Sequence, residues 1–134
     1  MLTVDQNVWS LYVGDANLAL QEIEQSLLVL ESDGSSAEEI NRLYRALHTI
    51  KGNSALLELA QIESLAHCAE VVVGFVRDAG ATLDRVMVDL MLGVVDVLRA
   101  GVEHVAQTHG DVPAEAVAPQ LALLRDWQTA HNVR

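Results

Sequence analysis

A histidine, a lysine and a glycine stand close together in the segment "YRALHTIKGNS", residues 44–54. Lys51 and Gly52 follow His48 by three and four residues, so in a helix all three lie on one side. A neutral imidazole with an exposed nitrogen is a nucleophile, and a nearby cation attracts an incoming anion. Glycine inside a helix costs roughly 1 kcal/mol relative to alanine, so its presence suggests that space is needed there. These residue types and their spacing predict an acceptor site for a phosphoryl group at His48.

A second polar group follows in the next predicted helix, where Glu63, His67 and Glu70 are spaced by four and three residues. At about 100° per residue they form a polar ridge, and His48 lies roughly 130° from the apolar stripe of its own helix. A short turn joins the two segments, so we expect them to pack antiparallel, with His48 and Glu70 at a similar height. A carboxylate at Nδ1 of His48 fixes the tautomer and leaves the Nε2 lone pair outward. An ordinary surface pair is the alternative.

Five segments with helical periodicity are expected to position these residues. They cover about 6–31, 37–55, 59–79, a fourth segment that starts after Thr82 and ends before the loop 108–113, and 114–132. Ser36 and Glu39 resemble a capping box, Gly80 is a helix terminator, and Thr82 is a candidate cap. Short connections force antiparallel neighbours. The sequence therefore predicts an all-α fold: an up-down antiparallel four-helix bundle with an appended C-terminal helix, as a single domain of residues 1–134.

Composition and charge narrow the possible partners. The 134 residues are 51% hydrophobic but only 4% aromatic, which suits close-packed helices. With 19 acidic and 8 basic residues, the net charge of −11 disfavours nucleic acid and anionic lipid and favours a protein partner or a small ligand. No uncharged stretch reaches the roughly 18 residues needed to span a bilayer, no signal-peptide pattern opens the chain, and the single cysteine fits a reducing compartment. We expect a cytoplasmic protein that is monomeric as an isolated domain.

The stretches "ALHTIKGNSALLEL" (46–59) and "QIESLAHCAE" (61–70) resemble the histidine phosphotransfer (HPt) domain, above all the amino-terminal domain of chemotaxis-type histidine kinases. The likeness spans nearly the whole chain, since "LDRVMVDLMLGVVDVLRAGV" (83–102) resembles the family's fourth helix. It implies that His48 is phosphorylated at Nε2, that Lys51 and Gly52 supply a cation and clearance, and that His67 and Glu70 are hydrogen-bonding partners of the imidazole. Glu58 stands where the family has a second glycine, so we expect a different or strained turn.

The resemblance also implies that ATP and Mg²⁺ are supplied by partner domains, namely a histidine kinase catalytic domain and a response-regulator receiver domain. The chain has no glycine-rich phosphate loop followed by Lys-Ser/Thr, so whether it counts as an enzyme stays open and no intrinsic cofactor is expected. A di-iron bundle is disfavoured, because no Glu-x-x-His occurs. A non-catalytic docking bundle with an unused histidine remains the alternative, with Tyr44, Leu56 and Leu57 as an apolar patch. Cys68 is interpreted as structural.

Overall fold

The computed structural model describes residues 5–133, which form five α-helices and no strand. The helices are α1 (Gln6–Ser32), α2 (Ala37–Leu56), α3 (Ala60–Asp78), α4 (Arg85–Thr108) and α5 (Ala114–Ala130). The predicted all-α class is confirmed, and most predicted helix ends lie within two residues of those observed. Residues 1–4 and 134 of the predicted domain lie outside the described residues.

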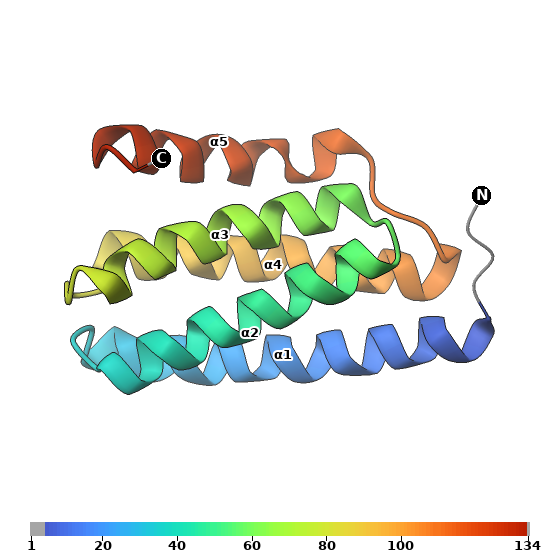
Figure 1. The fold of residues 1–134 in the computed structure, drawn as a ribbon, viewed down its shortest axis with the longest axis horizontal. Coiled ribbons are helices and arrows are strands. Elements are labelled where there is room, and N and C mark those ends of the chain that lie inside the picture. The colour runs from blue at the N-terminus through green and yellow to red at the C-terminus, as the bar shows by residue number, and fades with distance from the viewer. Residues whose placement is uncertain (1–4, 134) are drawn as a thin grey trace.

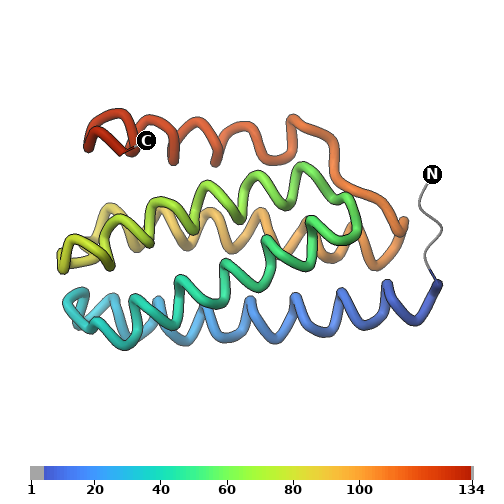
Figure 2. The backbone as a smooth tube through the Cα atoms, in the orientation of Figure 1, coloured from blue at the N-terminus to red at the C-terminus, as the bar shows by residue number. Residues whose placement is uncertain are grey.

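Consecutive helices run antiparallel, as Figure 1 shows. α1 packs against α2 and α4, and α3 packs against the same two helices, so α1 to α4 close a four-helix bundle. α5 lies outside that bundle and packs against α3 and α4, and the tube in Figure 2 shows the extended connection that leads to it. The predicted up-down bundle with an appended C-terminal helix is therefore confirmed. Among the described residues, no helix combines the length and the hydropathy that a membrane span requires.

The core consists of the apolar stripes that helical periodicity identifies. In the first three helices the predicted apolar stripe residues are buried, and burying each large aliphatic side chain stabilises the fold by roughly 1.5–3 kcal/mol. The stripe that periodicity predicts for α4 is partly wrong; its members are Leu83, Met87, Leu90, Val94, Val97 and Gly101. Leu90 and Val97 are only partly buried, while Met91 and Leu98, which lie outside this stripe, are buried. The buried stripe residues of α1 to α3 are Ala16, Leu20, Ile23, Leu27, Leu30, Ile40, Leu43, Leu47, Ile50, Ile62, Leu65, Ala66, Ala69, Val73 and Val76.

The helix ends confirm the Ser36 half of the predicted capping box and the terminator at Gly80, and they correct a third signal. The N–H of Ser36 donates to the carbonyl of Asp33 at 3.3 Å rather than to the side chain of Glu39. Ser36 Oγ accepts the N–H of Glu39 at 3.4 Å, and Gly80 follows α3 with φ of 62°. The cap predicted at Thr82 is wrong. The N–H of Leu83 donates to the carbonyl of Gly34 at 2.8 Å, which fixes the chain before α4, and Asp84 caps the helix by accepting the N–H of Met87 at 2.9 Å.

The turn between α2 and α3 contains Glu58 with φ of 58°. This is the left-handed region, where a side chain costs roughly 1–2 kcal/mol and glycine costs almost nothing. The strain expected from the missing glycine is therefore present. The turn keeps its shape through the N–H of Leu59, which donates to the carbonyl of Ser54 at 2.9 Å.

The N-terminus of α3 is capped from a distant part of the chain. Leu59 stands at the N-cap and has no side-chain acceptor. Instead, Asp111, in the loop between α4 and α5, accepts the N–H of Gln61 at 2.6 Å and that of Ile62 at 3.4 Å. A carboxylate there also interacts favourably with the positive end of the helix dipole. The loop before α5 thus anchors the helix that carries His67 and Glu70.

Candidate functional site

The site forms where α2 and α3 pack side by side, with His48 on α2 and Glu70 on α3. Nδ1 of His48 is hydrogen-bonded to Oε2 of Glu70. A carboxylate only accepts hydrogen bonds, so Nδ1 carries the proton and Nε2 keeps its lone pair. The imidazole remains 61% exposed while the Glu70 side chain is 6% exposed. The structure thus combines an accessible nucleophilic nitrogen with a buried group that orients it.

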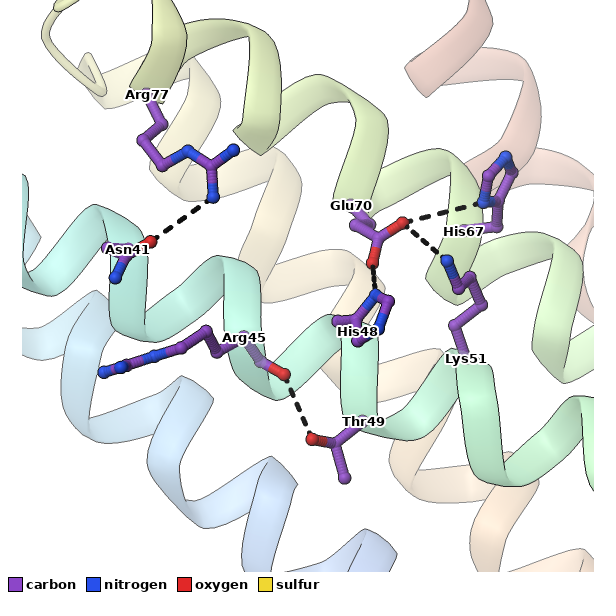
Figure 3. A network of polar contacts seen from close by, with 8 residues as sticks. All are labelled: Asn41, Arg45, His48, Thr49, Lys51, His67, Glu70 and Arg77. Carbon is purple, nitrogen blue, oxygen red and sulfur yellow. Dashed lines mark hydrogen bonds and ion pairs between the residues drawn. The ribbon is translucent and has the colours of Figure 1, made fainter.

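Lys51 and His67 both approach the other oxygen of the same carboxylate, as Figure 3 shows. Lys51 Nζ lies 3.0 Å from Oε1 of Glu70, which is a charge-assisted hydrogen bond. His67 Nδ1 lies 3.7 Å from that oxygen, beyond hydrogen-bond distance. The structure therefore brings the predicted residues His48, Lys51, His67 and Glu70 together around one carboxylate, with Lys51 paired to Glu70 and His67 next to Glu70.

Glu70 is buried, whereas the helical wheel placed it on a polar ridge with Glu63 and His67. Its relative exposure is 4%, while His67 is exposed and Glu63 is partly buried. The wheel gives a direction relative to the apolar stripe of α3, but α2 covers that direction at the level of Glu70. Burial is tolerated because His48 and Lys51 each donate to one oxygen of Glu70.

Gly52 leaves the surface open one turn after His48. A Cβ built at this position would meet no heavy atom within 4 Å, so nothing inside the chain requires the glycine. The missing side chain leaves room beside the imidazole, as the sequence predicted. Leu56, one further turn along α2, is 77% exposed and adds an apolar surface next to this gap.

Tyr44, Leu56 and Leu57 do not form the exposed apolar patch that the sequence predicts, because only Leu56 is exposed. Leu57 is partly buried against the core. Tyr44 is partly buried too, because its ring lies under Arg77 of α3 and beside Gly74. Arg77 and Gly74 were not identified from the sequence. The available signal was weak: Arg77 follows Glu70 by seven residues and therefore lies on the same side of α3.

Cys68 and Tyr12 are buried groups near the site. The thiol of Cys68 donates to Oε1 of Gln128 in α5 at 3.2 Å, and burial raises the pKa of this thiol. This location agrees with the structural role expected for Cys68. The hydroxyls of Tyr12 and Ser54 share a hydrogen bond of 2.8 Å, which links α1 to α2, and burial raises the pKa of the Tyr12 phenol.

No cluster of three or more histidine, cysteine, aspartate or glutamate side chains suited to a metal ion occurs within residues 5–133. The groups that the site itself presents are an oriented imidazole, a buried carboxylate and a lysine.

The site thus consists of an exposed imidazole on one helix of a bundle and a buried carboxylate on the next helix that orients it. This arrangement is typical of a domain that carries a chemical group on a histidine. The sequence pattern of the Hpt domain matches residues 7–108, and the chain belongs to this family. α5 lies outside the matched range.

Relatives and solved structures agree with this assignment. The chain is 29% identical, over 119 residues and 89% of its length, to the chemotaxis protein CheA of Treponema pallidum. It is 41% identical, over 81 residues and 59% of its length, to the gliding motility regulatory protein of Myxococcus xanthus. These matches cover 14% and 10% of the two relatives, so the chain spans a small part of such proteins.

A solved structure superposes with a TM-score of 0.88 at 38% identity. It is the phosphorylated P1 domain of CheA3 in complex with CheY6 from R. sphaeroides, and the match covers 92% of this chain and 97% of that one. Within the Hpt family, the chain is thus similar to the domains of CheA-like chemotaxis kinases.

Proposed function

We propose that His48 carries a phosphoryl group between a kinase domain and a receiver domain. In the first step the Nε2 lone pair attacks the γ-phosphorus of ATP, the bond from phosphorus to the bridging oxygen breaks, and ADP leaves. In the second step a receiver aspartate oxygen attacks the phosphorus, the P–N bond breaks, and its electron pair returns to Nε2. No proton has to enter or leave the ring, since Nδ1 keeps its hydrogen throughout.

The observation that carries this proposal is the pairing of exposed His48 with buried Glu70. Once Nε2 is phosphorylated, the ring is positively charged and Nδ1–H donates to a carboxylate. Charge-assisted hydrogen bonds of this kind are roughly twice as strong as neutral ones. Glu70 therefore stabilises the phosphorylated ring more than the free ring, which is the requirement for a carrier.

Lys51 has a double role in this proposal. In the free chain Lys51 Nζ is paired with Glu70, so the cation is held beside the imidazole rather than extended into solvent. Its side chain is 23% exposed, which leaves part of the ammonium group accessible. A phosphoryl group on Nε2 supplies a second anion for the same cation.

Two partner domains are inferred because the sequence contains no glycine-rich phosphate loop and because the chain belongs to the Hpt family. ATP and Mg²⁺ would be supplied by partner domains, a histidine kinase catalytic domain first and a response-regulator receiver domain second. The receiver is supported by the similar P1 domain, whose structure is a complex with CheY6. We propose that this exchange takes place in the cytoplasm, where ATP is available, and that the isolated domain acts as a monomer.

The surface beyond Gly52 suits such a partner. Leu56 is 77% exposed and, with Val8 and Leu11 of α1, lines a shallow hollow of about 150 Å³. Asp15 and Asn53 add polar atoms at its edge. Exposed leucines surrounded by polar residues are typical of transient protein interfaces.

The test is labelling with radioactive ATP, Mg²⁺ and a CheA-type kinase catalytic domain, followed by addition of a receiver domain. We expect acid-labile, base-stable label on the unsubstituted chain and none on His48→Gln, with both proteins equally helical by circular dichroism. His104→Gln is the matched control, because it removes a histidine of α4 that lies outside this site, and it should keep the label. Label on His48→Gln, or none on the unsubstituted folded chain, would support instead a docking bundle with an unused histidine.

A further inference from the structure

Tyr44 lies one turn before His48 on α2, and the two rings are nearly parallel. Their centroids are 6.4 Å apart and their planes differ by 17°. This separation is within the range at which aromatic rings interact, although it is longer than that of a closely stacked pair. Tyr44 therefore forms a wall on the N-terminal side of the imidazole, opposite the open surface at Gly52.

α3 holds the Tyr44 ring from two directions. The guanidinium carbon of Arg77 lies 4.0 Å from the ring centroid, a cation–π contact, and Nη1 of Arg77 donates to Oδ1 of Asn41 at 3.3 Å (Figure 3). A Cβ at Gly74 would lie 3.0 Å from Cε2 of Tyr44, closer than such atoms normally approach. A side chain at residue 74 would therefore require the Tyr44 ring to shift by a few tenths of an ångström.

His48 needs such a wall because Glu70 constrains one atom of it. A single hydrogen bond to Nδ1 leaves the ring able to turn about its broad χ2 torsion, and most of the ring faces solvent. In-line phosphoryl transfer requires Nε2 to point at the phosphorus, and misplacement by about 1 Å can cost on the order of 100-fold in rate. A neighbouring aromatic ring on this side limits how far the imidazole can turn.

We propose that Tyr44 is a positioning residue for phosphoryl transfer at His48, held in place by Arg77 and Gly74. This inference rests on the proposed function and adds three residues to the site. We assign this role to the ring of Tyr44 rather than to its hydroxyl, because Arg77 lies over the ring face and the His48 ring is nearly parallel to it.

The test uses phosphoramidate, a small donor that needs no protein partner. Nε2 forms a bond to phosphorus while the P–N bond of phosphoramidate breaks and ammonia leaves. We expect Tyr44→Ala and Gly74→Ala to lower the rate at saturating phosphoramidate by on the order of tenfold, with KM changed less than about twofold. Tyr44→Phe, which keeps the ring, should restore the rate to within about twofold of the unsubstituted chain.

Gly93→Ala is the matched control for close packing. It introduces a Cβ 3.1 Å from Oε1 of Gln120, away from the site, and should leave the rate unchanged. Nitrogen NMR of the His48 ring gives a second readout, since loss of the wall should shift and broaden its signals without unfolding the chain.

Three results would overturn the inference: full rates with Tyr44→Ala, a Tyr44→Phe chain as slow as Tyr44→Ala, or equal losses with Gly93→Ala. Failure of the proposed function has a different signature, because the unsubstituted chain would then take up no phosphoryl group at His48.

Discussion

Replacing Glu70 by glutamine separates the charge of this side chain from its shape. Oε2 of the carboxylate accepts from Nδ1 of His48 and Oε1 accepts from Lys51 Nζ at 3.0 Å. Glutamine occupies the same volume but has one oxygen, so only one of these donors keeps an acceptor. The side chain is 6% exposed, so water cannot readily take the place of the lost oxygen.

The magnitude follows from what changes at the ring. A hydrogen bond to a charged group contributes about 1 to 2 kcal/mol more than a neutral one. This difference applies mainly to the phosphorylated ring, which is cationic, and corresponds to about 5- to 30-fold in rate or equilibrium. We expect Glu70→Gln to slow phosphorylation of His48 by this factor and to leave transfer from phosphohistidine to a receiver unchanged or faster, because the loss of stabilisation falls on the state from which this transfer starts.

The assay is rapid-quench measurement of label gain from a kinase domain and of label loss to a receiver domain. Glu63→Gln is the matched control, since it removes a carboxylate two turns earlier on the same side of α3 and should change neither rate. Equal slowing in both directions would refute the argument, because it would mean that the substitution merely misplaces the imidazole. Equal effects of Glu63→Gln and Glu70→Gln would refute it as well, since general charge would then be responsible.

Three further substitutions test other parts of the structure. Glu58→Gly should raise the free energy of unfolding by about 0.5 to 1 kcal/mol, because glycine relieves the strain of the left-handed backbone at this position. The gain should appear as a higher melting temperature in circular dichroism. Glu58→Ala should show no such gain, and an equal gain would mean that the effect comes from removal of the charge. Gly52→Glu should block transfer to a receiver. It should leave the melting temperature unchanged or higher, since a side chain there meets open space and glycine is a poor helix residue. Normal transfer would show that the open surface at residue 52 is not used by the receiver. Asp111→Ala should lower stability by about 1 kcal/mol in denaturant unfolding through loss of the α3 cap, and an unchanged midpoint would mean that the cap contributes nothing.

The helices and their order were predictable because the relevant signals are local. Periodicity identifies a stripe, and a cap such as Ser36 acts within one turn. The same procedure failed at the start of α4, where Thr82 and Asp84 are both acceptable caps. The choice between them was made by the contact of Leu83 with Gly34, which lies far away in the sequence.

The residues of the candidate site could be predicted from the sequence, but the burial of Glu70 could not. Spacing placed His48 and Glu70 at similar heights, and the structure joins them. That Glu70 is buried depends on the rotation of α2 against α3, which neither stripe determines alone. Asp111 and Arg77 were missed for a related reason: each acts on a residue more than thirty positions away, across a helix contact.

Gly74 and Gly52 lie on opposite sides of His48 and differ in their surroundings. Together they leave the imidazole open on one side only. Gly74 is favoured by packing, because a Cβ there would lie 3.0 Å from Cε2 of Tyr44 and would displace the ring. Gly52 is not required by packing, since the space above it is empty. One side of His48 is therefore filled by the chain itself, and the other is left open and continues to the exposed Leu56. This asymmetry favours approach of the proposed kinase and receiver domains from the C-terminal half of α2, so that under the proposed function one open side would serve both in turn.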